Sequence, residues 1–451
     1  MNSSGKTPNI IVEPPGPRAL DIIRRDEQYV MQSFSRWYPL VACTGHGAIL
    51  EDVDGNKYID FNSGLAVLNV GHLHPKVVEA IKKQAGKLLH YSLTDFYYEE
   101  AVILAERLVK IAPGSFGKKV FFTNSGAEAI EGSMKIARGS FEGKRPYIIA
   151  FSGSFHGRTY GAMSLTSSKP VQRKWFSPLV PNIEHTPCPY CYRCPFKMEY
   201  PECDVWCIHF IEEWILNKYV PSDEVAAIFL EPIAGEGGYI VPPPRVWREL
   251  RKLADKHGIL IVSDEVQAGF GRAGKWFAIE HWGVLPDIIA VAKGIASGLP
   301  LGAIIGREDV MKLPAGSHAT TFGGNPISCA AALAVIDVIE EEKLLDNALK
   351  MGYYIMDRLS DLMEEVEIIG DVRGIGLMIG VELVKNRDTK EPAREELKKV
   401  LMECFKRGLL VIGAGISTIR IAPPLVITKE EVEVGLDILE DVIKKVSREV
   451  N

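Results

Sequence analysis

Two apolar runs of the sequence each end in a side chain that can do acid–base or covalent chemistry. The first run, in residues 258–267, ends in Asp264, and the second, in residues 287–294, ends in Lys293. Both are short, rich in β-branched residues and bounded by Gly, Pro or charge, which predicts buried strands. In an open α/β sheet, ligands bind at the edge where strands end. A lysine and an aspartate there suit an aldehyde cofactor with a basic ring nitrogen, because the lysine can form a Schiff base and the aspartate can keep the nitrogen protonated.

Each of these residues also has an ordinary explanation when it is taken alone. A lysine after a strand is usually solvated, and an aspartate there is usually a turn former or a helix cap. The chemical interpretation therefore depends on the motifs that surround the two residues.

Those motifs resemble the class III (ω-amino acid) aminotransferases. The matching motifs are Asp264-Glu265-Val266-Gln267, Gly269-Phe270-Gly271-Arg272-Ala273-Gly274 and Ala292-Lys293-Gly294, and the resemblance extends over about residues 38–443. It implies pyridoxal 5'-phosphate as the cofactor, with Lys293 and Asp264 as catalytic residues. It also implies an α/β protein of fold type I: a large domain with a mostly parallel seven-stranded sheet, one strand of it antiparallel, and a smaller α+β domain.

The strand candidates in the middle of the chain mostly alternate with helix-like stretches, as in a parallel sheet. The last two, 288–292 and 302–306, are only about nine residues apart, too few for a parallel crossover. We therefore expect them to be antiparallel neighbours, with Lys293 in the turn between them. The earlier candidates are 119–123, 147–151, 225–231 and 259–263.

The expected domains are residues 76–325, a large cofactor-binding domain, and 326–451, a C-terminal small domain. By resemblance, residues 1–75 pack with the small domain. Alternation around Asp54-Gly55 predicts a hairpin. Further expected elements are a helix in 18–32, a helix through 330–341 followed by further helix to about 363, a Gly-marked strand at 374–383, and helices at 391–407 and 429–448.

Residues 121–129 combine a strand with the start of a helix. The backbone N–H groups of Ser125, Gly126 and Ala127, with the Ser125 hydroxyl, can bind a phosphate at the positive end of the helix dipole. The same pattern also describes a simple helix cap followed by Glu128. In the family, the matching residues bind the cofactor phosphate.

The resemblance assigns four more residues to the cofactor. Phe155 matches the residue that covers the ring face, a role that suits an aromatic side chain, and His156 lies close by. Gln267 matches the residue that hydrogen-bonds the ring hydroxyl. Thr321 matches a phosphate ligand that the neighbouring subunit donates, which implies an obligatory homodimer with shared active sites.

Substrate recognition is also implied by the resemblance. Arg158 matches an arginine that holds a substrate carboxylate, a task for a planar fork of donors, although a surface ion pair is its ordinary alternative. Glu236 matches a residue that forms an ion pair with Arg420 when the amino donor is an ω-amine. When 2-oxoglutarate binds, this residue releases the arginine, which then binds the α-carboxylate. The alternative is that Glu236 is an ordinary carboxylate in a loop. Ala234 departs from the family, which usually has Gln there, and this can alter nearby hydrogen bonds.

The implied reaction is a ping-pong transfer of an amino group to a 2-oxo acid. Tyr38 and Arg158 match donor-binding residues of ornithine aminotransferases, but Leu65 replaces a tyrosine that favours ornithine. We therefore expect donors of the 4-aminobutyrate type, with ornithine or lysine as alternatives. A racemase on the same scaffold is the main rival, although such racemases tend to have Asp in place of Glu236. A pyridoxal-binding regulator would carry a DNA-binding segment, and the sequence has no helix-turn-helix pattern or basic region.

The composition limits the other classes of function. The 451 residues are 47% hydrophobic and 24% charged, with a net charge of -6, as in an ordinary globular protein. No basic block predicts nucleic acid as a partner, and no apolar run reaches the length of a membrane span. Without a signal-peptide core, the expected location is the cytoplasm.

Five of the eight cysteines lie close together in the sequence, at positions 188, 191, 194, 203 and 207. Their spacing admits three interpretations: a zinc or iron–sulfur site, a structural disulfide, or reduced thiols in a loop. His72 and His74 also resemble metal ligands, but without acidic or Cys partners nearby we expect capping and loop packing. No metal is therefore expected at the active site.

Overall fold

The structure is a computed structural model that describes residues 7–450. The chain forms two compact units. One is Lys76–Leu345, and the other combines the described residues up to Pro75 with those from Asp346 onward. Helix α9 (Pro326–Glu341) groups with the larger unit, and the domain division expected at residue 325 stays a prediction.

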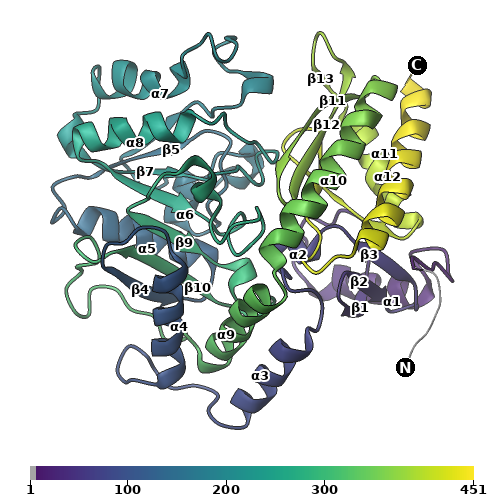
Figure 1. Cartoon of the computed structure of the whole chain (residues 1–451), viewed down its shortest axis with the longest axis horizontal. Helices are drawn as coiled ribbons and strands as arrows, with labels where there is room; N and C mark the ends of the chain where they lie inside the picture. Colours follow the sequence, from purple (N-terminus) through teal and green to yellow (C-terminus); the bar gives the residue numbers. More distant parts are fainter. Residues whose placement is uncertain (1–6, 451) are drawn as a thin grey trace. The chain divides into compact units, whose positions relative to one another are not determined.

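The larger unit contains a seven-stranded sheet (Figure 1). Strand β10 is antiparallel to both of its neighbours, whereas the strands from β9 to β6 run parallel. This confirms the expected sheet and the antiparallel pair on either side of Lys293. The spatial order is β4 (Lys118–Thr123), β10 (Gly302–Arg307), β9 (Ile288–Val291), β8 (Leu260–Asp264), β7 (Val225–Leu230), β5 (Tyr147–Phe151) and β6 (Ile183–Thr186).

One strand of this sheet, β6, was not among the strands expected from the sequence. Its four residues, Ile-Glu-His-Thr, show no apolar run, and β6 lies at the edge of the sheet, paired only with β5. An edge strand needs less apolar surface than a central one, so hydrophobicity gives a weak signal there.

The central strands are apolar throughout because both faces of the sheet are covered. Helix α5 (Gly126–Gly139) packs Ile130 and Met134 against alternate strand residues such as Ala150, Phe229 and Ala290. On β5, Phe151 meets Trp247 of α8 edge-on, with ring centroids 5.4 Å apart. The other helices of this unit are α3 (Pro75–Ala85), α4 (Glu99–Ile111), α6 (Tyr160–Leu165), α7 (Trp206–Phe210) and α8 (Val246–His257).

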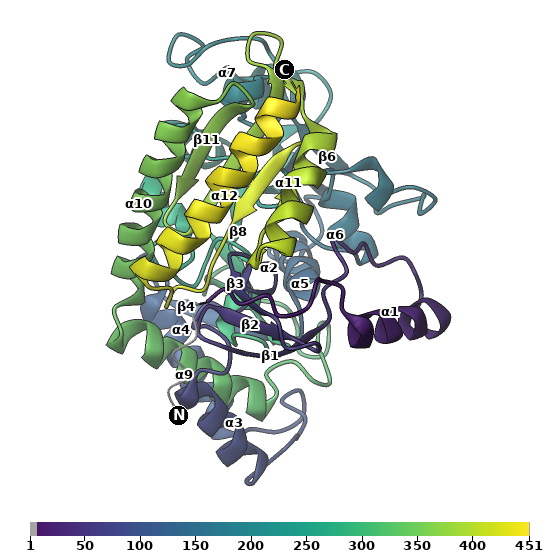
Figure 2. The ribbon, with the colours of Figure 1, turned by 90° about the vertical axis from the view of Figure 1, so that its right-hand side faces the viewer.

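The smaller unit joins the two ends of the chain. Strands β2 (Ile49–Asp52) and β3 (Lys57–Asp60) form the expected hairpin, and β3 pairs in parallel with β14 (Leu409–Leu410). Helices α11 and α12 lie side by side, and α11 also contacts β12, β15 and β16 of a second sheet (Figure 2). The remaining elements are α1 (Pro17–Tyr29), β1 (Ala42–His46), α2 (Ser63–Ala66), α10 (Leu344–Glu365), β11 (Ile369–Ile375), β12 (Met378–Asn386), β13 (Glu391–Pro392), α11 (Arg394–Lys406), β15 (Ile412–Ala414), β16 (Thr418–Ile421) and α12 (Lys429–Val450).

The expectation of one strand over residues 374–383 is wrong. The chain turns there, and β11 and β12 form an antiparallel pair in which Ile375 lies opposite Met378. Gly376 takes a φ of 57° in this turn, a conformation that glycine adopts without steric cost. The apolar pattern continues through the turn, so the sequence did not reveal the reversal.

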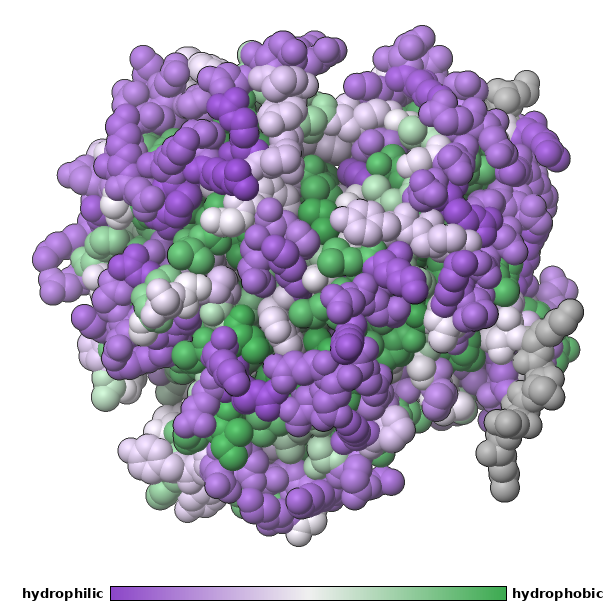
Figure 3. All heavy atoms as spheres, in the orientation of Figure 1, coloured by the Kyte–Doolittle hydropathy of each residue, from purple (hydrophilic) through white to green (hydrophobic). Residues whose placement is uncertain are grey.

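Hydrophilic residues cover most of the face drawn in Figure 3, with smaller groups of apolar residues between them. Within residues 7–450, no helix combines the length and apolar character needed to cross a membrane.

His72 lies 2.8 Å from Asp60, Nε2 to Oδ2, so its ring is held by a carboxylate in the smaller unit. In the described part of the chain, no group of three or more His, Cys, Asp or Glu is placed to hold a metal ion.

No disulfide joins any of the eight cysteines, all of which lie within the described residues. Burial raises the pKa of Cys191 to about 11 and that of Cys207 to about 12, and neighbouring thiols of the loop add to both shifts. Because the thiolate is the reactive form, both groups are poor nucleophiles at neutral pH.

We therefore expect eight thiols to react with a disulfide reagent after unfolding without reductant. In the folded protein, the buried Cys329 and Cys404 should react most slowly. A count below eight after unfolding in a chelator would indicate a disulfide. A count that rises only with chelator, together with zinc or iron detected by mass spectrometry, would indicate a metal site.

Candidate active site

Asp264 and Lys293 lie at the carboxyl ends of neighbouring parallel strands, as the sequence predicts. Asp264 ends β8 opposite Ala290 of β9, and Lys293 follows just after β9. Lys293 has a φ of 46°, in the left-handed region. Such a backbone costs a residue with a Cβ about 1–3 kcal/mol and tends to occur at functional sites. The surrounding structure therefore holds Lys293 in a conformation that it would rarely adopt alone.

The Asp264 carboxylate is buried and hydrogen-bonded on both oxygens. Its Oδ2 lies 2.7 Å from Nδ1 of His156, and its Oδ1 accepts the Val266 N–H at 3.0 Å. Burial disfavours the charged imidazole, but the hydrogen bond and charge of Asp264 outweigh it, so the pKa of His156 is raised. His156 thus holds the Asp264 carboxylate in place at the end of β8, where a carboxylate can pair with a protonated ring nitrogen.

The start of α5 provides free backbone donors. Ser125 is the N-cap of this 14-residue helix, and its Oγ accepts the Glu128 N–H at 3.2 Å. Glu128 in turn accepts the Asn124 N–H at 2.7 Å, so the helix cap considered as an alternative is also present. The cap leaves the N–H groups of Gly126 and Ala127 without acceptors inside the helix. The helix start can therefore be capped and bind an anion as well.

Two glycines allow the loops at this edge of the sheet to approach one another. A Cβ on Gly126 would lie 2.7 Å from Cγ1 of Val266, and a Cβ on Gly157 would lie 2.8 Å from the Ala127 Cβ. The segment predicted to bind phosphate therefore lies against both the segment that follows Asp264 and the segment that follows His156. The larger unit brings these predicted cofactor residues together.

Glu231, for which the sequence predicted no role, joins the loop that holds Phe155 to the loop that holds Gly235. Its Oε1 accepts the Phe155 N–H at 2.8 Å, and its Oε2 accepts the Gly235 N–H at 2.9 Å. Phe155 also lies under the Arg158 guanidinium, 5.3 Å from the ring centroid. The only sequence signal for Glu231 was its position at the end of an apolar run.

We expect Glu231→Gln to change the pH dependence of stability. Burial raises the pKa of Glu231 from 4.5 to about 7; His156 opposes the shift and Asp264 adds to it. A folded pKa above the unfolded one means that the folded protein binds this proton more tightly, so stability falls as pH rises from about 4.5 to 7. Over that range, the free energy of unfolding of wild type should fall by up to about 3 kcal/mol more than that of the variant. Denaturant unfolding of both proteins at several pH values measures this, and parallel curves would contradict it.

Glu236 forms an ion pair within the larger unit that the sequence analysis did not anticipate. Its Oε1 lies 2.6 Å from Nζ of Lys169. Lys169 follows a polar stretch with no motif, so no sequence signal pointed to it. Together with Arg158 on the loop after β5, the larger unit places two cations and one acid on neighbouring loops.

Tyr38 and Arg420 belong to the smaller unit. Tyr38 stacks on Phe405 with ring centroids 4.7 Å apart. Burial raises the pKa of Tyr38, Asp60 adds to the shift, and the Arg420 charge opposes it. Arg420 lies on β16 and is buried. The smaller unit therefore keeps these two substrate-binding candidates near each other.

The last two cofactor candidates lie in different surroundings. The Oε1 of Gln267 accepts a hydrogen bond from the Tyr239 hydroxyl at 2.9 Å. Thr321 lies exposed in a loop, beside Thr320, whose Oγ1 is 3.0 Å from Nδ2 of Asn124. The contribution of Thr321 to a neighbouring subunit stays a prediction.

Comparison with known proteins identifies the family. Residues 31–443 match the family model described as aminotransferase class-III. This chain belongs to the class III aminotransferases. An alanine/serine racemase of Pyrococcus horikoshii is 43% identical over 98% of this chain and 95% of its own length. A probable 4-aminobutyrate aminotransferase of Bacillus subtilis is 41% identical over 92% and 96%.

A solved structure of a transaminase also resembles this chain. An amine transaminase from an uncultivated Pseudomonas species, in the PLP-bound form, has a TM-score of 0.85 and 31% identity over 94% of this chain and 98% of its own. Class III aminotransferases depend on pyridoxal 5'-phosphate. The residues of this aminotransferase suit that cofactor: free N–H donors at the start of α5 for the phosphate, a buried carboxylate for the ring nitrogen, and a lysine for the aldehyde.

Proposed function

We propose that this enzyme moves the amino group of an ω-amino acid, of the 4-aminobutyrate or ornithine type, to 2-oxoglutarate in a ping-pong reaction. The observation that carries the proposal is the ion pair between Lys169 and Glu236. An ω-amino donor brings no carboxylate near its reacting carbon, whereas 2-oxoglutarate does. A site that serves both needs an acid that neutralises a cation in one half-reaction and frees it in the other. Glu236 already neutralises the Lys169 cation in this structure, and we propose that it acts as this switch.

The cofactor, when bound, supplies a ring that accepts electrons from the substrate carbon. We propose that Lys293 holds its aldehyde and, once the donor amine displaces it, moves a proton between the substrate carbon and the aldehyde carbon. Asp264, held by His156, keeps the ring nitrogen protonated. Phe155 covers the ring face, and the segment Ser125-Gly126-Ala127 holds the phosphate.

The substrate-binding residues of the smaller unit belong to the same proposal. Tyr38 contributes to the donor site, and Arg420 receives the α-carboxylate of 2-oxoglutarate when Glu236 releases it. Leu65 is aliphatic and half-exposed, which favours a donor of the 4-aminobutyrate type over ornithine. The active form is proposed to be a homodimer, to which the exposed Thr321 contributes a phosphate ligand for the partner's cofactor.

A racemase is the second candidate. The similarity to an alanine/serine racemase, 43% identity over 98% of this chain, supports it. The same Lys293 would remove the proton, and a second base would return one to the opposite face of the substrate carbon. Such a reaction needs no oxo acid.

One experiment separates the two candidates. The cofactor-loaded protein is mixed with single amines and no acceptor while the visible absorbance of the cofactor is followed. Bleaching by 4-aminobutyrate or ornithine that 2-oxoglutarate reverses supports the aminotransferase and identifies its donor. Loss of optical activity from L-alanine or L-serine without any oxo acid, with no lasting bleaching, would overturn it in favour of the racemase.

A further inference from the structure

Tyr239 combines a buried side chain with a left-handed backbone conformation. The side chain is fully buried, yet the backbone has a φ of 53°, in the region that residues with a Cβ rarely adopt. The residue closes a tight loop: its N–H donates to the Gly235 carbonyl at 3.2 Å, and Ala234 and Ile240 pair as a bridge beside it. A strained backbone persists only where the surrounding structure holds it, and such positions gather at ligand sites.

The Tyr239 hydroxyl contacts the oxygen end of the Gln267 side-chain amide. It donates to Oε1 of Gln267 at 2.9 Å. On the other side of the amide, a Cβ at Gly235 would lie 2.2 Å from Nε2 of Gln267, so the absence of a side chain at Gly235 makes room for the nitrogen. The amide therefore has its oxygen engaged by Tyr239 and its nitrogen against Gly235. With the oxygen engaged, its remaining capacity is mainly that of a donor.

We propose that Tyr239 is a positioning residue that makes Gln267 a hydrogen-bond donor to the ring oxygen of the cofactor, and so favours the form in which that oxygen carries no proton. The proposal rests on the proposed position of Gln267 beside the ring oxygen. Without the Tyr239 hydroxyl, the Gln267 amide is free to turn. It can then present Oε1, which accepts a hydrogen bond from a protonated ring hydroxyl instead.

The test compares the binding of two cofactors to wild type and to three variants. Wild type, Tyr239→Phe, Gln267→Ala and Tyr58→Phe are each loaded with pyridoxal 5'-phosphate and with its 3-deoxy analogue, which lacks the ring hydroxyl. Dissociation constants are measured for both cofactors, and the visible spectrum is recorded with the natural one. Tyr58 is a matched control, because it is a buried tyrosine of the smaller unit whose hydroxyl donates to Asp52 at 2.8 Å.

Tyr239→Phe is expected to bind pyridoxal 5'-phosphate about fivefold more weakly, the effect of one ordinary hydrogen bond. It should bind the 3-deoxy analogue as wild type does, and its spectrum should shift toward the form with a protonated ring oxygen. Gln267→Ala should show the same selective loss, and Tyr58→Phe should show none. This pattern supports the proposal, because a merely structural role would affect both cofactors equally.

Two results would overturn the proposal, and they differ in what else they reject. If Gln267→Ala selectively weakens the natural cofactor but Tyr239→Phe weakens both equally or neither, only the role of Tyr239 is wrong. If Gln267→Ala does not distinguish the two cofactors, then Gln267 does not lie beside the ring oxygen. In that case the proposed cofactor placement fails together with the inference.

Discussion

Lys293→Ala is expected to lower turnover with any amino donor by about 10³-fold or more. Lys293 comes just after the central strand β9, beside the strand end that carries Asp264, and it is proposed to make both the bond to the cofactor and the proton transfer. Loss of a positioned acid–base group alone costs roughly 10²–10⁴-fold, and loss of the covalent contact adds to it. Steady-state rates with 4-aminobutyrate and 2-oxoglutarate measure the effect.

The matched control is Lys119→Ala. Lys119 lies on β4 of the same sheet but is exposed, and its Nζ pairs with Glu308 at 3.2 Å. This variant should keep wild-type turnover. The Lys293 variant should still bind cofactor through the α5 start and Asp264, without the absorbance of the lysine-linked form. Wild-type activity in Lys293→Ala would refute the assignment.

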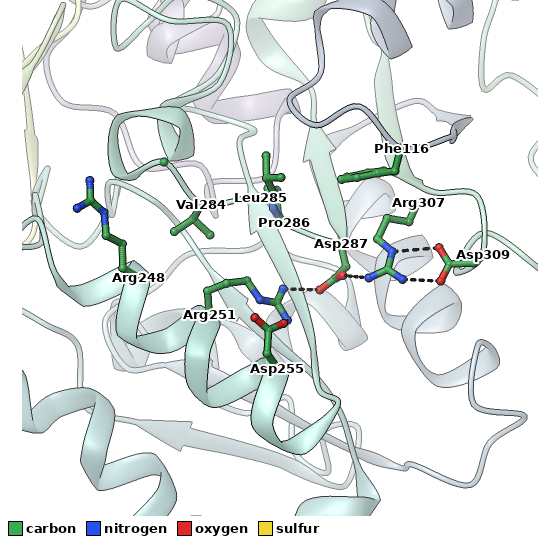
Figure 4. Close-up of a pocket in the computed structure, with 11 residues that line it drawn as sticks. Phe116, Arg248, Arg251, Asp255, Val284, Leu285, Pro286, Asp287, Arg307 and Asp309 are labelled. Atoms are coloured by element: carbon green, nitrogen blue, oxygen red, sulfur yellow. Dashed lines mark hydrogen bonds and ion pairs between the residues drawn. The ribbon is translucent and has the colours of Figure 1, made fainter.

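Asp287→Ala is expected to reduce the free energy of unfolding by about 3 kcal/mol. Asp287 lies just before β9, at the end opposite Lys293, and its buried carboxylate joins two arginines (Figure 4). Its Oδ2 is 2.7 Å from Arg251 of α8, and its Oδ1 is 2.7 Å from Arg307 at the end of β10. Breaking a buried ion pair from one side costs about 3–5 kcal/mol. The lower value applies here because Arg251 and Arg307 keep second acidic partners.

The control for this prediction is Asp309→Ala. Asp309 also pairs with Arg307, and with Asp287 it lines the pocket drawn in Figure 4, but its side chain is 57% exposed. An exposed pair contributes about 1 kcal/mol or less. Denaturant unfolding of the two variants should therefore separate them clearly. Equal losses would show that burial of Asp287 does not set the cost.

Sequence alone was enough to locate the strand ends near which Asp264 and Lys293 lie. The runs before Asp264 and Lys293 are strongly apolar because both faces of the sheet are covered, so hydrophobicity alone located them. The short connection between β9 and β10 required the antiparallel pair. The segment at Ser125, which is predicted to bind phosphate, could be recognised because a strand, a cap residue and a helix follow one another directly along the chain.

Only the tertiary structure decided which loops hold one another. His156 meets Asp264, Glu231 meets Phe155, Lys169 meets Glu236, and Tyr239 meets Gln267. These partners are distant in the chain, and their contacts depend on the order of strands in the sheet. Local periodicity reports which face of a strand is buried but not which strand lies beside it. The edge strand β6 was missed because its residues form no apolar run, and the reversal at Gly376 was missed because the apolar pattern continues through the turn.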